Sequence, residues 1–208
     1  MKSQIDFQSY IDTGTQAYAE GDYATGGKIF LAAMKDAKRV NLKDAQLVAI
    51  LYNLALFYSQ QQRPKKAEVL LEKALAYAEA IFGRNGSAVD HILNRLADLL
   101  VKEQQYVRAE ALYNRSLQIE RRLFGNDHPR LYKKLLKVAW VQSLQSNFDT
   151  AEKHLKDALE LQISAAQAQQ VAAGDITANS SAFDSAISAE ADALIDDLIA
   201  EEIELPAN

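Results

Sequence analysis

Three stretches of this 208-residue chain align with one another without a gap, and this internal repeat limits the fold more than any other sequence feature. They run from Leu51 to Leu75, from Leu93 to Leu117 and from Leu135 to Leu159. Each contains an Ala-Glu pair at the same place, so that the pair recurs every 42 residues. One such unit is too small to bury its apolar face alone, and the sequence therefore predicts a stack of similar modules.

Within each unit, the apolar residues recur at the spacing of an α-helix. The first stripe of the first unit falls at i, i+3, i+4 and i+7, on Leu51, Leu54, Ala55 and Tyr58. A second stripe begins at Ala67, and turn-forming residues such as Pro64 lie between the two. Each unit is therefore predicted to be a hairpin of two amphipathic helices.

The glycine-rich stretch GDYATGGK, residues 21–28, is similar to a phosphate-binding loop but fails its pattern at two of four fixed positions. Asp22 stands where the first glycine is needed, and Ile29 stands where a hydroxyl is needed. Placing Gly26 in register with the alanine of the Ala-Glu pairs instead makes Ile11 to Ala33 a divergent first repeat. Asp22 then becomes a helix N-cap and Gly26 a site of close helix packing, whereas Gly27 has no evident role.

The composition favours a helical, water-soluble chain and excludes several chemistries. Hydrophobic residues make up 49% and charged residues 25%, with only 8 Gly and 3 Pro. Because there is no cysteine, disulfides, Cys-ligated zinc and thiol catalysis are excluded. The N-terminus lacks the apolar core of a signal peptide, and nowhere do 18 apolar residues run together. We therefore expect a cytoplasmic protein that does not bind membranes.

Charge is distributed unevenly along the chain. Residues 165–208 contain nine acids and no Lys or Arg, whereas the first 164 residues contain 19 acids and all 23 basic residues. The segment 182–208 also has a stripe of apolar residues at helical spacing and is predicted to be an acidic amphipathic helix. Such a tail opposes nucleic-acid binding, so no nucleic-acid partner is expected.

The repeat resembles the tetratricopeptide repeat, and its length of 42 residues, its Ala-Glu pairs and the segment LFGNDHP resemble the kinesin-light-chain subtype. The unit beginning at Leu93 supplies the family's residues on both helices at Leu93, Leu96, Ala97, Tyr106, Ala109, Tyr113 and Ser116. This resemblance implies an all-α, right-handed superhelix of four hairpins in residues 1–164. We expect the remaining chain to form a helix extension and linker (165–181) and the acidic C-terminal helix (182–208). The hairpins are expected at 7–40, 48–83, 90–125 and 132–164.

The resemblance also implies that a peptide or helix of a protein partner binds in the concave groove formed by the first helix of each hairpin. The positions expected to face this groove are Tyr52, Asn53, Leu56, His91, Asn94, Arg95, Asp98, Lys133, Leu136, Lys137 and Trp140. The asparagines can bond a peptide backbone, the cations Arg95, Lys133 and Lys137 can hold a carboxylate, and Trp140 can anchor an apolar group. An acidic ligand, or one with a free C-terminal carboxylate, is expected.

The carboxylate clamp of chaperone-binding tetratricopeptide proteins matches this chain only at Asn53 and Arg95. His91 replaces a lysine of that clamp, and Ile11 and Thr15 replace its remaining lysine and asparagine. A chaperone clamp is therefore not predicted.

The expected function is that of a non-catalytic adaptor or scaffold, with no catalytic, cofactor-binding or metal-binding residue. The histidines at 91, 128 and 154 show no metal-ligand spacing. Two alternatives remain open from the charge pattern: self-assembly into a homo-oligomer, and autoinhibition by the acidic helix lying in a basic groove. The acidic helix could also simply cap the last repeat. The hypothesis of a nucleotide-dependent enzyme rests only on residues 21–28.

Overall fold

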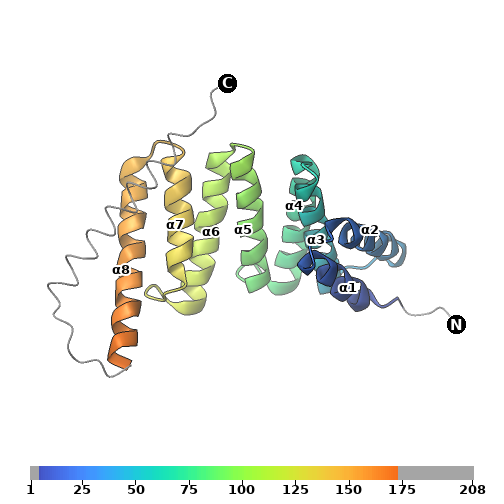
Figure 1. The fold of residues 1–208 in the computed structure, drawn as a ribbon, viewed down its shortest axis with the longest axis horizontal. Coiled ribbons are helices and arrows are strands. Elements are labelled where there is room, and N and C mark those ends of the chain that lie inside the picture. The colour runs from blue at the N-terminus through green and yellow to red at the C-terminus, as the bar shows by residue number, and fades with distance from the viewer. Residues whose placement is uncertain (1–4, 173–208) are drawn as a thin grey trace.

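The computed structural model describes residues 5–172, which form eight helices and no strand (Figure 1). The helices pair into four hairpins, so the predicted all-α solenoid of four hairpins is confirmed. The acidic helix predicted at 182–208 lies outside the described residues. The pairs are α1 (Phe7–Ala19) with α2 (Tyr23–Val40), α3 (Ala45–Gln60) with α4 (Pro64–Phe82), α5 (Ser87–Lys102) with α6 (Tyr106–Phe124), and α7 (Leu131–Ser143) with α8 (Phe148–Ala172).

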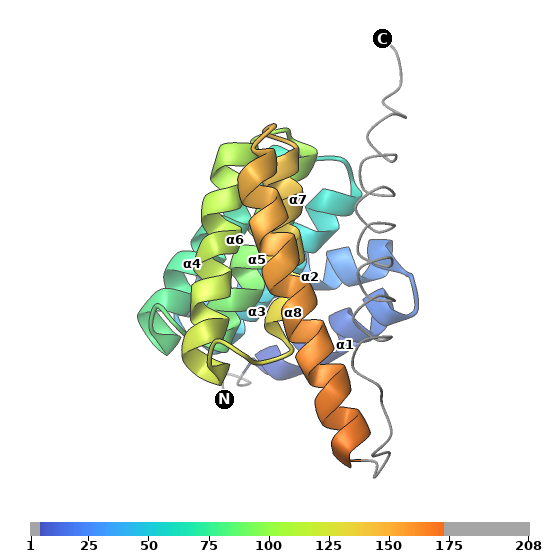
Figure 2. The same cartoon turned by 90° about the vertical axis from the view of Figure 1, so that its left-hand side faces the viewer.

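Each helix packs mainly on the helices that precede and follow it in the chain, as expected for a stack of hairpins. Helices α5 to α8 stand side by side, whereas α1 and α2 run across them at the N-terminal end (Figures 1 and 2). The first hairpin is held to the second by the Tyr18 hydroxyl, which donates to the backbone carbonyl of Asn53 at 3.1 Å.

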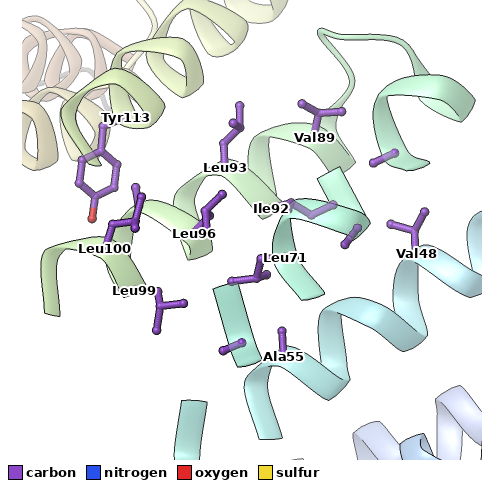
Figure 3. Close-up of a cluster of buried hydrophobic side chains, with 14 of the residues drawn as sticks. Val48, Ala55, Leu71, Val89, Ile92, Leu93, Leu96, Leu99, Leu100 and Tyr113 are labelled. Atoms are coloured by element: carbon purple, nitrogen blue, oxygen red, sulfur yellow. The ribbon is translucent and has the colours of Figure 1, made fainter. Parts of the chain in front are cut away.

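The core follows the repeat register. Leu51, Leu93 and Leu135, which are equivalent in the three aligned units, are at most 4% exposed. Figure 3 shows Ile92 of α5 pointing towards Val48 of α3. The alanines of the three Ala-Glu pairs, Ala67, Ala109 and Ala151, are also buried.

Every hairpin turns through one residue with a positive φ angle, at Gly21, Gln62, Gln104 and Ser146. The amide of the following residue donates to the carbonyl five residues earlier, as in the bond from Gln105 to Leu100 at 2.8 Å. This is the Schellman arrangement, in which glycine is the favoured residue. Three of the four turns therefore hold a residue with a side chain in a left-handed conformation that costs about 1 kcal/mol.

Changing Gln104 to glycine is expected to raise the free energy of unfolding by about 0.5–1 kcal/mol, because glycine adopts the observed φ of 58° without strain. Urea unfolding followed by circular dichroism measures the effect. Gln118→Gly, at an exposed position inside α6, is the matched control and should lower stability by about 1 kcal/mol. Equal losses in the two variants would contradict the strain at Gln104.

The glycines of residues 21–28 serve helix capping and packing. The Asp22 carboxylate accepts a hydrogen bond from the Thr25 amide at 2.9 Å, which confirms the predicted N-cap of α2. A Cβ atom at Gly26 would overlap the Tyr18 ring and lie 2.9 Å from the carbonyl oxygen of Gly14, so the predicted close packing there is also confirmed. The side chain of Lys28 is exposed.

Gly27, which the sequence left without a role, makes room for an aromatic ring. A Cβ atom at this position would overlap the ring of Phe57, which comes from α3 and is 7% exposed. The later units have Leu99 and Val141 at the Phe57 position and a glutamate, such as Glu68, at the Gly27 position. The first repeat therefore combines a larger ring on one helix with no side chain on the other.

Candidate functional site

The predicted groove positions all lie on the odd-numbered helices α3, α5 and α7, and the 42-residue spacing makes them equivalent from hairpin to hairpin. The structure divides them into residues that remain accessible and residues that already contact other parts of the protein. The exposed members are His91, Arg95, Lys133 and Trp140. The half-buried members are Tyr52, Leu56, Asn94, Asp98, Leu136 and Lys137, and Asn53 is buried.

A shallow pocket of about 280 Å³ opens between the first halves of α3 and α5. Tyr52, Asn53 and His91 line it, as do Val48, Ile92 and Phe82 and the small residues Ala45, Ala49 and Ala88. The lining is mostly apolar, with the exposed imidazole of His91 and the exposed ring of Phe82 among its residues. This pocket can accept an apolar side chain of a bound segment.

Asn53 has its amide group engaged inside the protein. The Asn53 Nδ2 atom donates to the carbonyl of Ala49 in the same helix at 2.9 Å. The whole residue is only 8% exposed. The neighbouring groove position, Tyr52, is half-buried and faces the pocket. Within this pocket, Tyr52 and His91 are therefore the better placed ligand contacts.

The equivalent cations Arg95 and Lys137 have different surroundings. The Lys137 ammonium lies 2.6 Å from the Asp98 carboxylate and 5.2 Å from the centre of the Tyr113 ring. Asp98 also accepts a hydrogen bond of 2.5 Å from the Tyr113 hydroxyl, and burial together with this bond raises the pKa of Tyr113. Arg95 lies beside Leu56, which occupies the position equivalent to Asp98. Asp98 lines the same small pocket as Arg95 but is paired with Lys137, and Arg95 forms no ion pair with any residue between 5 and 172.

A buried polar cluster lies between α5, α6 and α7. The Lys134 ammonium lies 3.0 and 2.9 Å from the two carboxylate oxygens of Asp90 and 2.7 Å from the Ser116 hydroxyl. The Asn94 amide donates to the same hydroxyl at 2.7 Å. Burial is the main cause that raises the pKa of the neighbouring Glu120 carboxyl, Asp90 adds to the rise, and Lys134 opposes it. Asn94 therefore belongs to an internal network.

Sequence reasoning missed Asp90, Ser116 and Lys134, although a comparison of the repeats would have revealed them. Their equivalents 42 residues earlier in the chain are Val48, Ala74 and Ile92, which are all buried and apolar. Three polar residues at positions that are apolar one repeat earlier indicate a cluster of mutual partners, because buried polar groups need hydrogen bonds. Asp90 and Lys134 thus fix the contact between α5 and α7 that Val48 and Ile92 make between α3 and α5.

Two of the predicted groove positions on α7, Lys133 and Trp140, have exposed side chains. Lys133 is equivalent to His91, and Trp140, which is 40% exposed, is equivalent to Asp98. Lys133 forms no ion pair with any of the residues that the structure describes.

Among the described residues, no three His, Asp or Glu side chains gather as metal ligands, and no helix is long and apolar enough to cross a membrane.

Two family models for the tetratricopeptide repeat match the sequence, one over residues 47–92 and one over residues 89–164. The chain belongs to the tetratricopeptide repeat family. Together the matches cover the last three hairpins, and the structure adds the divergent first one. No curated protein sequence matches the chain.

Solved structures share this fold, among them structures of kinesin-light-chain-like repeats. BtubC (BKLC) from P. vanneervenii has a TM-score of 0.72 at 20% identity, over 78% of this chain and 66% of that one. A variant of the putative kinesin light chain repeats from Podosopora anserina has a TM-score of 0.70 at 14% identity, over 95% and 96%. MamA AMB-1 has a TM-score of 0.59 at 21% identity, over 78% and 82%. These likenesses concern the fold, and the predicted repeat subtype is confirmed.

Proposed function

We propose that this protein is a non-catalytic scaffold that binds a segment of a protein partner along the face formed by α3, α5 and α7. The observation that carries the proposal is the position of two exposed cations, Arg95 and Lys133, beyond an apolar pocket on this face. Tetratricopeptide domains in general are modules for protein interaction, and the family membership supports this class of function.

The apolar part of the ligand would bind between α3 and α5. Tyr52 and His91 present aromatic surface beside the buried Val48 and Ile92, so an aliphatic or aromatic side chain would be removed from water there. Trp140 on α7 offers a second anchoring surface at the far end of the face.

The charged part of the ligand would be a carboxylate. Arg95 and Lys133 carry positive charges that no residue between 5 and 172 neutralises through an ion pair, whereas Lys134 and Lys137 are paired with Asp90 and Asp98. A carboxylate at either unpaired cation gains charge-assisted hydrogen bonds. A short acidic segment, or a free C-terminus, with a neighbouring apolar residue matches this arrangement.

Changing Arg95 and Lys133 together to alanine in the full chain is expected to weaken partner binding at least about tenfold, which corresponds to 1.4 kcal/mol. Affinity capture followed by mass spectrometry identifies the partner, and calorimetry with that partner measures the loss. Lys35→Ala with Lys153→Ala is the matched control, because both lysines are exposed on even-numbered helices. Equal binding by all three proteins would refute the proposed face.

A further inference from the structure

A large hollow lies on the opposite, even-numbered side of the stack. It has a volume of about 690 Å³ and runs between α2 and α4, with residues of α3 lining it as well. Leu31, Met34, Val69 and Tyr77 are among its apolar residues. Leu31 is 41% and Val69 50% exposed, so apolar surface remains in contact with water. This α2/α4 groove is separate from the face proposed above for partner binding.

Four lysines and no acid are among the residues lining the α2/α4 groove: Lys38, Lys65, Lys66 and Lys73. None of them forms an ion pair with any residue from 5 to 172. Lys66 lies over the Tyr58 ring, with its ammonium 5.3 Å from the ring centre. The groove therefore combines an apolar floor with a positive rim.

The next pair of even-numbered helices, α4 and α6, is joined by ion pairs that α2 and α4 lack. Between α4 and α6, Arg108 lies 2.7 Å from Glu68 and 3.2 Å from Glu72, and Arg115 lies 2.5 Å from Glu79. These five charged residues tie the second hairpin to the third.

The same positions one repeat earlier keep the cations but lose all the acids. Lys66 and Lys73 are equivalent to Arg108 and Arg115, whereas Gly27, Leu31 and Lys38 stand in place of the three glutamates. Cations that pair across α4 and α6 are thus left without carboxylates across α2 and α4. A ligand that supplies acids together with an apolar stripe would restore the missing interactions.

We infer that the α2/α4 groove binds the acidic segment 182–208 of a second copy of this protein. This segment contains eight acids and no basic residue, and it carries apolar residues at the spacing of one helical face. Those residues are Phe183, Ile187, Ala191, Leu194, Ile195, Leu198 and Ile199. An apolar stripe flanked by carboxylates complements an apolar floor flanked by lysines.

The position of the groove favours a second copy over the same chain. Helix α8 ends at Ala172 at one end of the stack, and α2 lies near the other (Figure 1). Because the donor segment follows α8 in the chain and the groove lies near the other end of the stack, each copy can bind the next, and oligomers larger than a dimer are expected at high concentration.

Light scattering of the full chain over a range of concentrations tests the inference. The wild-type mass should rise above that of a monomer, and Lys38→Glu with Lys66→Glu and Lys73→Glu should weaken association at least about tenfold. Reversing Glu190, Asp197 and Glu201 to lysine should have the same effect, because they lie beside the apolar stripe. Combining both sets of changes should restore association. Melting curves confirm that each variant is folded.

Carbodiimide cross-linking of an equal mixture of ¹⁵N-labelled and unlabelled full chains identifies the contact. Peptides that join a groove lysine to an acid of residues 182–208 should contain one labelled and one unlabelled partner. Cross-links within single chains only, cross-links to Lys133 in place of the groove lysines, or a monomer at every concentration would overturn the inference. The groove variant should still capture its partner through Arg95 and Lys133, so this test and that of the proposed function fail independently.

Discussion

Replacing Lys134 with isoleucine alone is expected to lower the free energy of unfolding by about 3–5 kcal/mol. The change leaves the Asp90 carboxylate, whose side chain is 11% exposed, without the ammonium 2.9 Å away. A buried charge that loses its partner costs more than the net contribution of the original pair. Urea unfolding followed by circular dichroism at neutral pH measures the loss.

An apolar version of the Asp90, Ser116 and Lys134 cluster already exists one repeat earlier in the protein. Val48, Ala74 and Ile92 occupy the positions equivalent to Asp90, Ser116 and Lys134, and all three are buried. The triple variant Asp90→Val, Ser116→Ala and Lys134→Ile is therefore expected to regain most of the stability that Lys134→Ile loses. A triple variant no more stable than Lys134→Ile would contradict this equivalence of the two contacts.

Changing Gly27 to alanine is expected to destabilise the protein by about 1–3 kcal/mol, through overpacking against Phe57. At an exposed position inside a helix the same change stabilises by about 1 kcal/mol, so even the direction of the effect tests the structure. Thermal unfolding of the full chain measures it. Lys28→Ala, one residue further along α2 and exposed, is the matched control and should change stability by less than about 0.5 kcal/mol.

A second change should rescue Gly27→Ala. Phe57→Leu gives α3 the residue that α5 carries as Leu99 and removes part of the ring that the new methyl group would meet. We expect the double variant to be more stable than the sum of the two single losses predicts, because the two positions are in direct contact. Additive losses would show that Phe57 is not what limits position 27.

The repeat period made the helices and their pairing predictable, because the core positions of the unit, such as those of Leu51, Ala55 and Ala67, are buried in each of the last three hairpins. Leu93 is buried for the same reason as Leu51, and the N-cap at Asp22 follows from its place before a helix. Gly27 could not be explained from its own repeat, because the ring that fills its space belongs to α3.

The groove positions were harder to interpret because the register tells which helix a residue is on, and not which side chains it meets. Arg95 and Lys137 are equivalent in sequence, yet Lys137 forms an ion pair with Asp98 and Arg95 forms none with the residues from 5 to 172. Likewise, Asn94 bonds Ser116 because this unit alone carries polar residues at these core positions. Differences between repeats, more than the repeat itself, indicate where the surface is specialised.

Photo-cross-linking tests most directly the claim that the face of α3, α5 and α7 binds a protein partner. Benzoylphenylalanine would replace Tyr52 or Trp140 on that face, or Val107 on α6, which is 73% exposed, as the control. Irradiation in cells should join a partner polypeptide to positions 52 and 140 and leave position 107 unlinked. Adducts at position 107 with none at 52 or 140 would contradict the account.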